Sequence, residues 1–184
     1  MEWSEDIELG RPALPPRAAP DRRTLRTRRV ARQLLELSRL TRGFERAEPQ
    51  DLELVGFVRT ILRDYPDAEA LGETDELWTR SDARRLASAL FAILDNAFVH
   101  GAPPVALSLE AGAIVITDHG AGFSPRLLAV ATEPFSTGSH AAGRGVGLGL
   151  AIAAAQIRLL GGELDLANHP PAGARVTIHL ASGV

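Results

Sequence analysis

The chain has 184 residues and no cysteine, and all 20 of its Lys+Arg residues are arginines. The absence of cysteine excludes a disulfide framework, a thiol nucleophile and a thiolate zinc site, and it fits a reducing compartment. The absence of lysine excludes a Walker A phosphate loop, a Schiff-base mechanism and a lysine general base. A net charge of −3 argues against general nucleic-acid binding. Any phosphate group must therefore be held by arginine, by backbone N–H groups or by a metal ion.

Residues 1–23 predict a flexible lead-in, because four prolines alternate with charged residues there. The acidic start of the chain lacks the apolar stretch of a signal peptide. No apolar run reaches the roughly 20 residues that span a bilayer. We therefore expect a cytoplasmic protein with no membrane segment in this chain.

Residues 24–46 predict an amphipathic helix and its end. Apolar residues recur at spacings of three to five from Leu25 to Leu40, arginines occupy the other faces, and Gly43 can end the helix. A single helix of this kind cannot bury its apolar stripe by itself. It must pack either on the rest of the chain or on a partner.

The remaining residues, 47–184, alternate between strand and helix patterns. Strands are expected at 52–55, 68–72, 77–80, 105–110, 113–117, 163–167 and 174–180. Helices are expected at 55–65, from 81 or 82 to 100, at 125–132 and at 146–160. This mixture predicts an α/β two-layer sandwich, with helices on one face of a mixed sheet.

Glycine is the most conspicuous local signal. Of 17 glycines, 13 follow Asn96, and the run Gly143–Leu150 alternates glycine with other residues before a predicted helix. Backbone N–H groups unobstructed by Cβ atoms, together with the positive end of a helix dipole, can hold a phosphate. Such glycines also permit tight packing, so the run alone leaves both interpretations open. It is not a Rossmann fingerprint, because no strong buried strand leads into it.

Two polar residues occupy positions that suggest ligand binding. Asp118 ends the apolar strand 113–117 and precedes a glycine-rich turn, so it can accept a hydrogen bond from an amino group such as that of adenine, or simply face solvent. Asn96 lies in mid-helix, where asparagine is a poor helix former. Its amide oxygen can ligate a hard cation such as Mg²⁺, or the side chain can cap a buried backbone group.

Four segments together resemble the ATP-binding domain of bacterial sensor histidine kinases, in the wider GHKL group shared with gyrase, HSP90 and MutL. The matching segments are Asp95–Ala97 (N box), Asp118–Phe123 (G1 box), Glu133–Phe135 (F box) and Gly145–Ile152 (G2 box). The resemblance runs from about Leu52 to the C-terminus. The F box is similar to the kinase branch, and Ala92 stands where gyrase and HSP90 place a water-activating glutamate.

The resemblance implies a Bergerat fold, a mixed and mostly antiparallel sheet of about five strands with helices on one face. It implies that Asn96 ligates Mg²⁺, that Asp118 binds the adenine amine, and that Phe135 anchors a lid at about 123–146. The residues expected to contact ATP are Asn96, His100, Asp118, Gly120, Gly122, Phe123, Phe135, Thr137, Arg144, Gly145, Val146, Gly147, Leu148 and Gly149.

Two positions depart from the family pattern. The family often has asparagine at the position of Ala92 and a basic residue at that of Val99. Loss of the base removes one phosphate contact, which Arg144 or His100 would have to replace. No residue is assigned a covalent role, so Asn96 and Arg144 are the candidates for direct participation in catalysis.

The acceptor histidine is the larger departure. In such kinases it lies on a dimerisation helix before the ATPase domain, whereas the histidines of this chain are His100, His119, His140, His169 and His179. Residues 24–46 resemble the end of the second dimerisation helix. The resemblance thus implies transfer of the ATP γ-phosphate to a histidine on another polypeptide or on a missing dimerisation domain, and then to a response regulator. The chain would be a natural split kinase or an excised catalytic domain.

Two other functions stay open. A nucleotide-gated binding or adaptor module without catalysis is supported by the missing base at Val99. A serine kinase of the anti-sigma type would share the N and G1 boxes, but the F box counts against it.

Overall fold

The structure is a computed structural model of the chain, and it describes residues 31, 33–40, 46–71, 76–110, 112–137 and 146–181. Several predictions fall outside these residues. They concern the lead-in 1–23, most of the predicted helix 24–46 before residue 33, and the stretch 138–145 with His140, Arg144 and Gly145.

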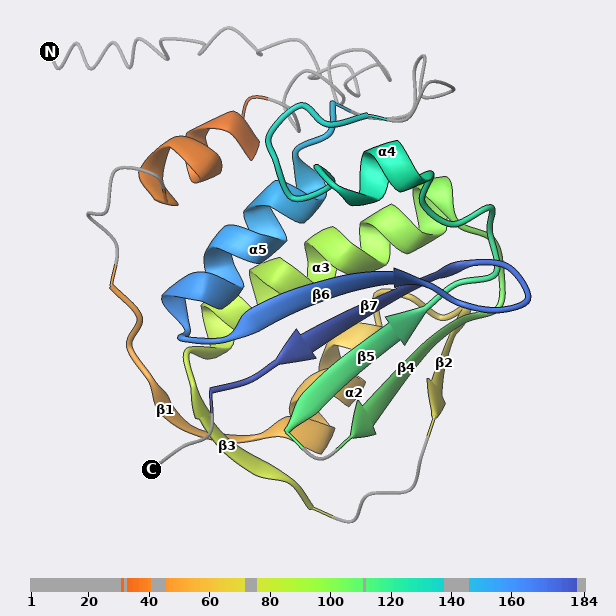
Figure 1. Cartoon of the computed structure of the whole chain (residues 1–184). Helices are drawn as coiled ribbons and strands as arrows, with labels where there is room; N and C mark the ends of the chain where they lie inside the picture. Colours follow the sequence, from red (N-terminus) through yellow and green to blue (C-terminus); the bar gives the residue numbers. More distant parts are fainter. Residues whose placement is uncertain are drawn as a thin grey trace, which may run out of the picture.

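A five-stranded sheet forms one layer, and the helices α2 (Leu54–Leu62), α3 (Ala83–His100) and α5 (Gly149–Leu159) cover one face of it (Figure 1). In spatial order its strands are β2 (Ala68–Leu71), β4 (Val105–Glu110), β5 (Ala113–Thr117), β7 (Ala174–His179) and β6 (Glu163–Asn168). Only the β2–β4 pair is parallel, and the other three pairs are antiparallel. The predicted two-layer sandwich with a mixed, mostly antiparallel sheet is confirmed.

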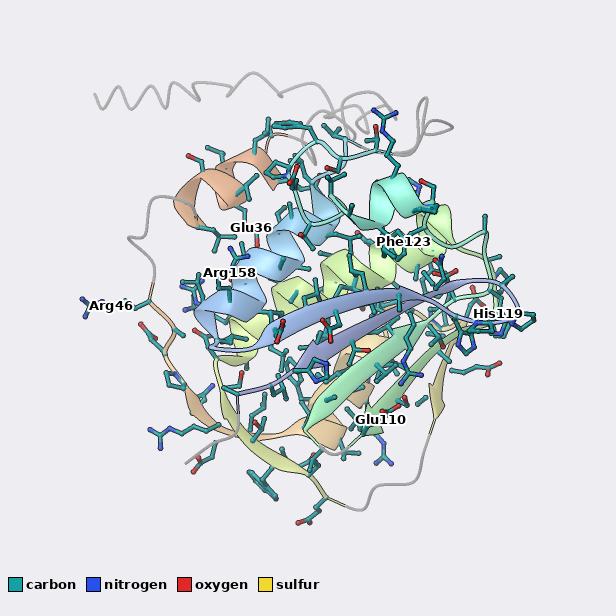
Figure 2. The ribbon with its side chains drawn as sticks, in the orientation of Figure 1. Glu36, Arg46, Glu110, His119, Phe123 and Arg158 are labelled. Carbon is teal, nitrogen blue, oxygen red and sulfur yellow. The ribbon has the colours of Figure 1, made fainter. Side chains whose placement is uncertain are left out.

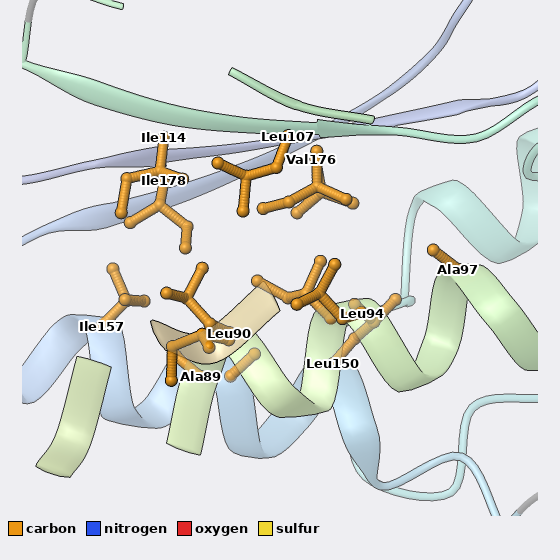
Figure 3. Packing of buried hydrophobic residues seen from close by; sticks show 14 of the residues in the cluster. Ala89, Leu90, Leu94, Ala97, Leu107, Ile114, Leu150, Ile157, Val176 and Ile178 are labelled. Carbon is orange, nitrogen blue, oxygen red and sulfur yellow. The ribbon is translucent and has the colours of Figure 1, made fainter. Parts of the chain in front are cut away.

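The core lies between the sheet and the paired helices α3 and α5. Figure 3 shows Leu107, Ile114, Val176 and Ile178 of the sheet facing Leu90, Leu94, Leu150 and Ile157 of the helices. Leu90 and Leu94 are fully buried, which makes α3 the central helix of the domain. Burying each such side chain contributes about 1.5–3 kcal/mol.

The helices α4 and α5 differ in length from the predictions. Helix α5 begins at Gly149 rather than Val146, because Gly147 has φ +70°, a left-handed conformation that an α-helix cannot contain. Helix α4 (Pro125–Leu128) is a single turn instead of extending to residue 132. It ends there because Val130 N–H bonds back to Leu127 O, a tighter pattern than the α-helix.

The sequence also did not predict a second and smaller sheet. Strands β1 (Gln50–Glu53) and β3 (Trp78–Ser81) pair antiparallel outside the main sheet. Strand β1 stops at Glu53, whose carboxylate caps α2 by accepting hydrogen bonds from Val55 N (2.8 Å) and Gly56 N (2.6 Å). The bond from Gly56 leads the interactions that lower the pKa of Glu53.

Residues 33–40 form a helix that lies along α5, drawn in orange in Figure 1. Leu40 is buried with Leu148 and Ile152, so the end of the predicted apolar stripe packs on the same chain, whereas Leu34 is 41% exposed. None of the helices in the described part of the chain is long and apolar enough to cross a membrane.

Asp82 joins three segments at the start of α3, where it is 3% exposed. Its carboxylate accepts hydrogen bonds from Arg84 N (3.0 Å) and Arg85 N (3.3 Å), which caps the helix, and from Glu48 N (3.1 Å) on the preceding linker. Burial by itself would raise the pKa of Asp82, but these hydrogen bonds and the charge of Arg84 outweigh burial and lower it.

Replacing Asp82 with alanine should lower the free energy of unfolding by about 2 kcal/mol at pH 7, because the α3 cap is lost. The pKa of Asp82 is lower in the folded chain than its ordinary 3.8. Its contribution is therefore complete above about pH 4 and is lost as the pH falls through the folded value. Denaturant unfolding at pH 7 and pH 3 should give a difference between wild type and Asp82→Ala that shrinks in acid.

Arg84→Ala separates the ion pair from the cap, since the Arg84 guanidinium lies 3.7 Å from Asp82 Oδ2, its side chain is 76% exposed and its capping N–H remains. It should change the free energy of unfolding by no more than about 0.5 kcal/mol. An Asp82→Ala difference of equal size at both pH values would contradict an ionised cap.

Candidate functional site

The end of α3 touches the turn after β5 through glycine backbones. A Cβ atom on Gly101 would lie 2.4 Å from Asp118 Cγ, and one on Gly120 would lie 2.6 Å from Gly101 Cα. His119 N–H also donates to Ala102 O at 2.9 Å. The structure thus joins the helix that carries the N box directly to the G1 box.

Asp118 is held rigidly in this contact and is 6% exposed. Its Oδ1 accepts hydrogen bonds from Gly120 N (2.8 Å) and Ala174 N (3.4 Å), and its own N–H donates to Ala174 O. Within the described residues no donor bonds to Oδ2. One carboxylate oxygen is therefore used to fix the side chain, and the other can accept a hydrogen bond from a ligand.

The rest of the G1 turn is held by Asn168, at the end of β6. Its side-chain amide accepts from Phe123 N (2.7 Å) and donates to Phe123 O (3.0 Å). Gly122 has φ +69°, and a Cβ there would lie 2.6 Å from Asn168 Oδ1. The Phe123 side chain is buried in the core (Figure 2), so this residue fixes the start of the following segment and exposes little more than backbone to a ligand.

Sequence reasoning missed three residues that shape this region, namely Gly101, Asn168 and Gly173. Gly173 has φ +123°, and a Cβ on it would lie 1.8 Å from Asp118 O, so no other residue fits without a shift. Gly101 had a usable signal, because a glycine directly after a long helix marks a helix end. Asn168 and Gly173 had none, since their partners are distant in sequence.

Asn96 lies on the half-buried side of α3, between the two ends of the site. Its side chain makes no hydrogen bond within the described residues, so it does not cap a buried backbone group. At Ala92, four residues earlier, the helix meets α5, since a Cβ on Gly149 would lie 3.5 Å from Ala92 O. From Ala92 to Gly101 the helix rises roughly 14 Å. Asn96 therefore lies midway between the start of α5 and Asp118.

The start of α5 has no side-chain cap, with Leu148 at the N-cap position. The first N–H groups of a helix have no partner within the helix, and with no capping side chain they can bind an anion. Leu148 itself is 1% exposed and points into the cluster with Leu40 and Ile152, so only its backbone faces this region.

The F box and the G2 box are in contact. Phe135 N–H donates to Gly147 O at 2.8 Å, and a Cβ on Gly147 would lie 2.5 Å from Ser136 O. The Phe135 side chain is 59% exposed, so within the described residues Phe135 is anchored by its backbone and not by its ring. The two boxes thereby join residues 135 and 136 to Gly147.

The other described residues that we predicted to contact ATP are exposed or half-buried. Thr137 is exposed just before residue 138, Val146 is half-buried, and His100 is exposed at the last residue of α3. Val99, where the family often has a base, is 38% exposed. His119 is an exposed loop residue as expected, with Nδ1 2.9 Å from Pro104 O.

The described residues contain no cluster of three or more His, Asp or Glu side chains that could hold a metal ion. A cation at Asn96 would thus depend mainly on ligand oxygens and water, the usual situation for Mg²⁺ bound with phosphates. A cavity of about 430 Å³, lined by Arg46, Arg80 and Leu159 among others, lies at the C-terminal end of α5 and not at this site.

Comparison with known proteins agrees with this geometry. Sensor protein CseC of Streptomyces coelicolor is 43% identical over 169 residues, which are 91% of this chain and 33% of CseC. The sensor histidine kinase component HK1 of Mycobacterium tuberculosis is 42% identical over 110 residues, which are 57% of this chain and 66% of HK1. The chain therefore spans about a third of the first relative and less than two thirds of the second.

Among solved structures, the ATP-binding domain of PrrB from Mycobacterium tuberculosis is 27% identical, with a TM-score of 0.60 over 74% of this chain and 98% of that domain. The family model described as histidine kinase-, DNA gyrase B-, and HSP90-like ATPase matches residues 81–183, more than half of the chain. These matches confirm the resemblance predicted from the four boxes, and the chain belongs to the family of histidine kinase-, DNA gyrase B- and HSP90-like ATPases.

Proposed function

We propose that the chain is the ATP-binding catalytic module of a two-component sensor histidine kinase. The observation that carries the proposal is the alignment of three groups along α3: the Asp118 carboxylate, the Asn96 amide and the uncapped start of α5. Each group suits a different part of Mg-ATP. The identity to CseC and HK1, both named as sensor proteins, supports the kinase branch of the family.

Adenine recognition is assigned to Asp118. Because Oδ1 is occupied by the N–H groups of Gly120 and Ala174, Oδ2 accepts the hydrogen bond from the exocyclic amine of adenine. Guanine has a carbonyl oxygen in place of that amine, and two acceptors facing each other cannot form a hydrogen bond. The site should therefore favour ATP over GTP.

Phosphate binding is assigned to the N-terminus of α5 and the glycines before it. The free N–H groups and the helix dipole favour an anion there. Mg²⁺ would be held by Asn96, the phosphates and water, and would neutralise charge on the phosphates. Arg144 is the candidate that replaces the base absent at Val99, and Gly145, His100 and Thr137 complete the proposed set.

The proposed reaction transfers the γ-phosphoryl group to a histidine of another polypeptide or of a dimerisation domain. A nitrogen–phosphorus bond forms as the bond from the γ-phosphorus to the β,γ-bridging oxygen breaks, ADP leaves with the electron pair, and the imidazole loses a proton. The chain contributes positioning and charge neutralisation rather than a nucleophile. We assign 24–46 to the end of a dimerisation helix, 47–184 to the catalytic domain, and the protein to the cytoplasm, with a response regulator as the eventual recipient.

Asn96→Ala should weaken Mg-ATP binding at least tenfold, because the only protein ligand assigned to the cation is removed. Calorimetric titration with ATP in Mg²⁺ measures the affinity, and the melting temperature checks the fold. In EDTA the two proteins should differ far less. Arg84→Ala, on the exposed first turn of the same helix, should bind like the wild type. Equal affinities of wild type and Asn96→Ala in Mg²⁺ would contradict the metal assignment.

Incubation with γ-labelled ATP and a separately produced dimerisation domain bearing the acceptor histidine should give an acid-labile phosphoprotein. The label should depend on both proteins and on Asn96. An acid-stable label would indicate a serine kinase of the anti-sigma type instead. Bound ATP without transfer would support the nucleotide-gated adaptor, which the absence of a base at Val99 favours.

A further inference from the structure

The helix at residues 33–40 packs along α5, and its last residue, Leu40, lies at the start of α5, beside the proposed phosphate site. Leu40 is 7% exposed and is clustered with Leu148 and Ile152, and Leu37 packs against the same cluster. Leu148 is the N-cap residue of α5 and lies one position before Gly149. The apolar contact of the 33–40 helix therefore supports the residue from which the phosphate-binding turn begins.

A polar contact accompanies the apolar one. Glu36 Oε1 accepts hydrogen bonds from Ser88 Oγ on α3 and from Gln156 Nε2 on α5, the latter at 2.9 Å. In Figure 2 Glu36 lies between the 33–40 helix and α5. One carboxylate oxygen thus joins three helices. Hydrogen bonds to a charged group are about twice as strong as neutral ones, and they are directional, so they fix one register of the helix on α5.

This contact continues into a buried network. Gln156 is 5% exposed and Arg85 is 7% exposed, and Arg85 Nη1 donates to Gln156 Oε1 at 3.1 Å. Arg85 Nη2 donates to Arg46 O at 2.9 Å, on the linker that follows the helix. The network therefore recognises both the helix, through Glu36, and the linker, through the Arg46 carbonyl. Such a network is strong when complete and unfavourable when one member is withdrawn.

We infer that the hydrogen bonds to Glu36 hold the 33–40 helix on α5, and that the position of this seated helix sets the affinity of the nucleotide site. The inference rests on the proposed ATP-binding function. The N-cap position of α5 has no side-chain hydrogen bond, so packing holds Leu148 in place. Removing the helix exposes Leu148 and loosens the turn that presents N–H groups to phosphate. Because coupling between two sites is reciprocal, bound Mg-ATP favours the seated helix by the same factor.

The test compares Glu36→Ala with Leu35→Ala in the full chain. Leu35 belongs to the same helix and is 63% exposed, so it is a matched control outside the contact. Calorimetry should show Mg-ATP binding weakened about fivefold to tenfold in Glu36→Ala and changed less than twofold in Leu35→Ala. Ser88→Ala should weaken binding as well, and it should add little in the Glu36→Ala background because its partner is already gone.

A second readout reports helix seating without relying on affinity. The chain has no cysteine, so Arg39→Cys with Arg158→Cys, at two exposed positions of the helix and of α5, takes a pair of spin labels. Their distance distribution should be narrow in the parent chain and broad with Glu36→Ala, and Mg-ATP should narrow the broad distribution. A broad distribution in Glu36→Ala with unchanged ATP affinity would overturn the coupling between helix position and nucleotide binding. A narrow distribution in Glu36→Ala would overturn the role of Glu36 in holding the helix. A parent chain that binds no Mg-ATP would instead overturn the proposed function, and the inference with it.

Discussion

The site depends on a close contact between the end of α3, the turn after β5 and the residue before β7. The backbones lie so close together there that three positions have no room for a side chain. Gly101, Gly120 and Gly173 meet around Asp118, and a Cβ atom on any of them would lie within 2.6 Å of a neighbouring atom. The approach buries the Asp118 carboxylate yet leaves Oδ2 available. Glycine is required here by space, and at Gly173 also by φ +123°.

Helix α3 also positions Asn96, the second polar residue of the site. Its buried leucines fix the position of its backbone between the sheet and α5, and so they fix where the polar residues of its remaining face start from relative to Asp118. Asparagine costs a helix several tenths of a kcal/mol relative to alanine. A helix stabilised by several fully buried leucines tolerates that cost. Packing therefore stabilises Asn96 at a position where the local propensity opposes it, and where its side chain has no hydrogen-bond partner among the described residues.

Much of this was accessible from sequence because the relevant signals are local. The apolar runs that form β4 and β5, and the start and length of α3, depend on neighbouring residues, and the structure confirms them. The contact between the F and G2 boxes, the Asn168 clamp on Phe123 and the pairing of β1 with β3 join residues distant in sequence. No periodicity records such contacts. The predicted start of α5 was wrong because no local signal distinguishes Gly147 from an earlier glycine as the residue that adopts the left-handed conformation.

The central claim is that Asp118 presents one free carboxylate oxygen to the amino group of adenine, and affinity for two nucleotides tests it most directly. Titration of the wild type and of Asp118→Asn with Mg-ATP and Mg-GTP measures that discrimination. The wild type should bind ATP at least tenfold more tightly than GTP, and Asp118→Asn should lose most of this preference while keeping its melting temperature within a few degrees. Equal affinity of the wild type for ATP and GTP would contradict the account.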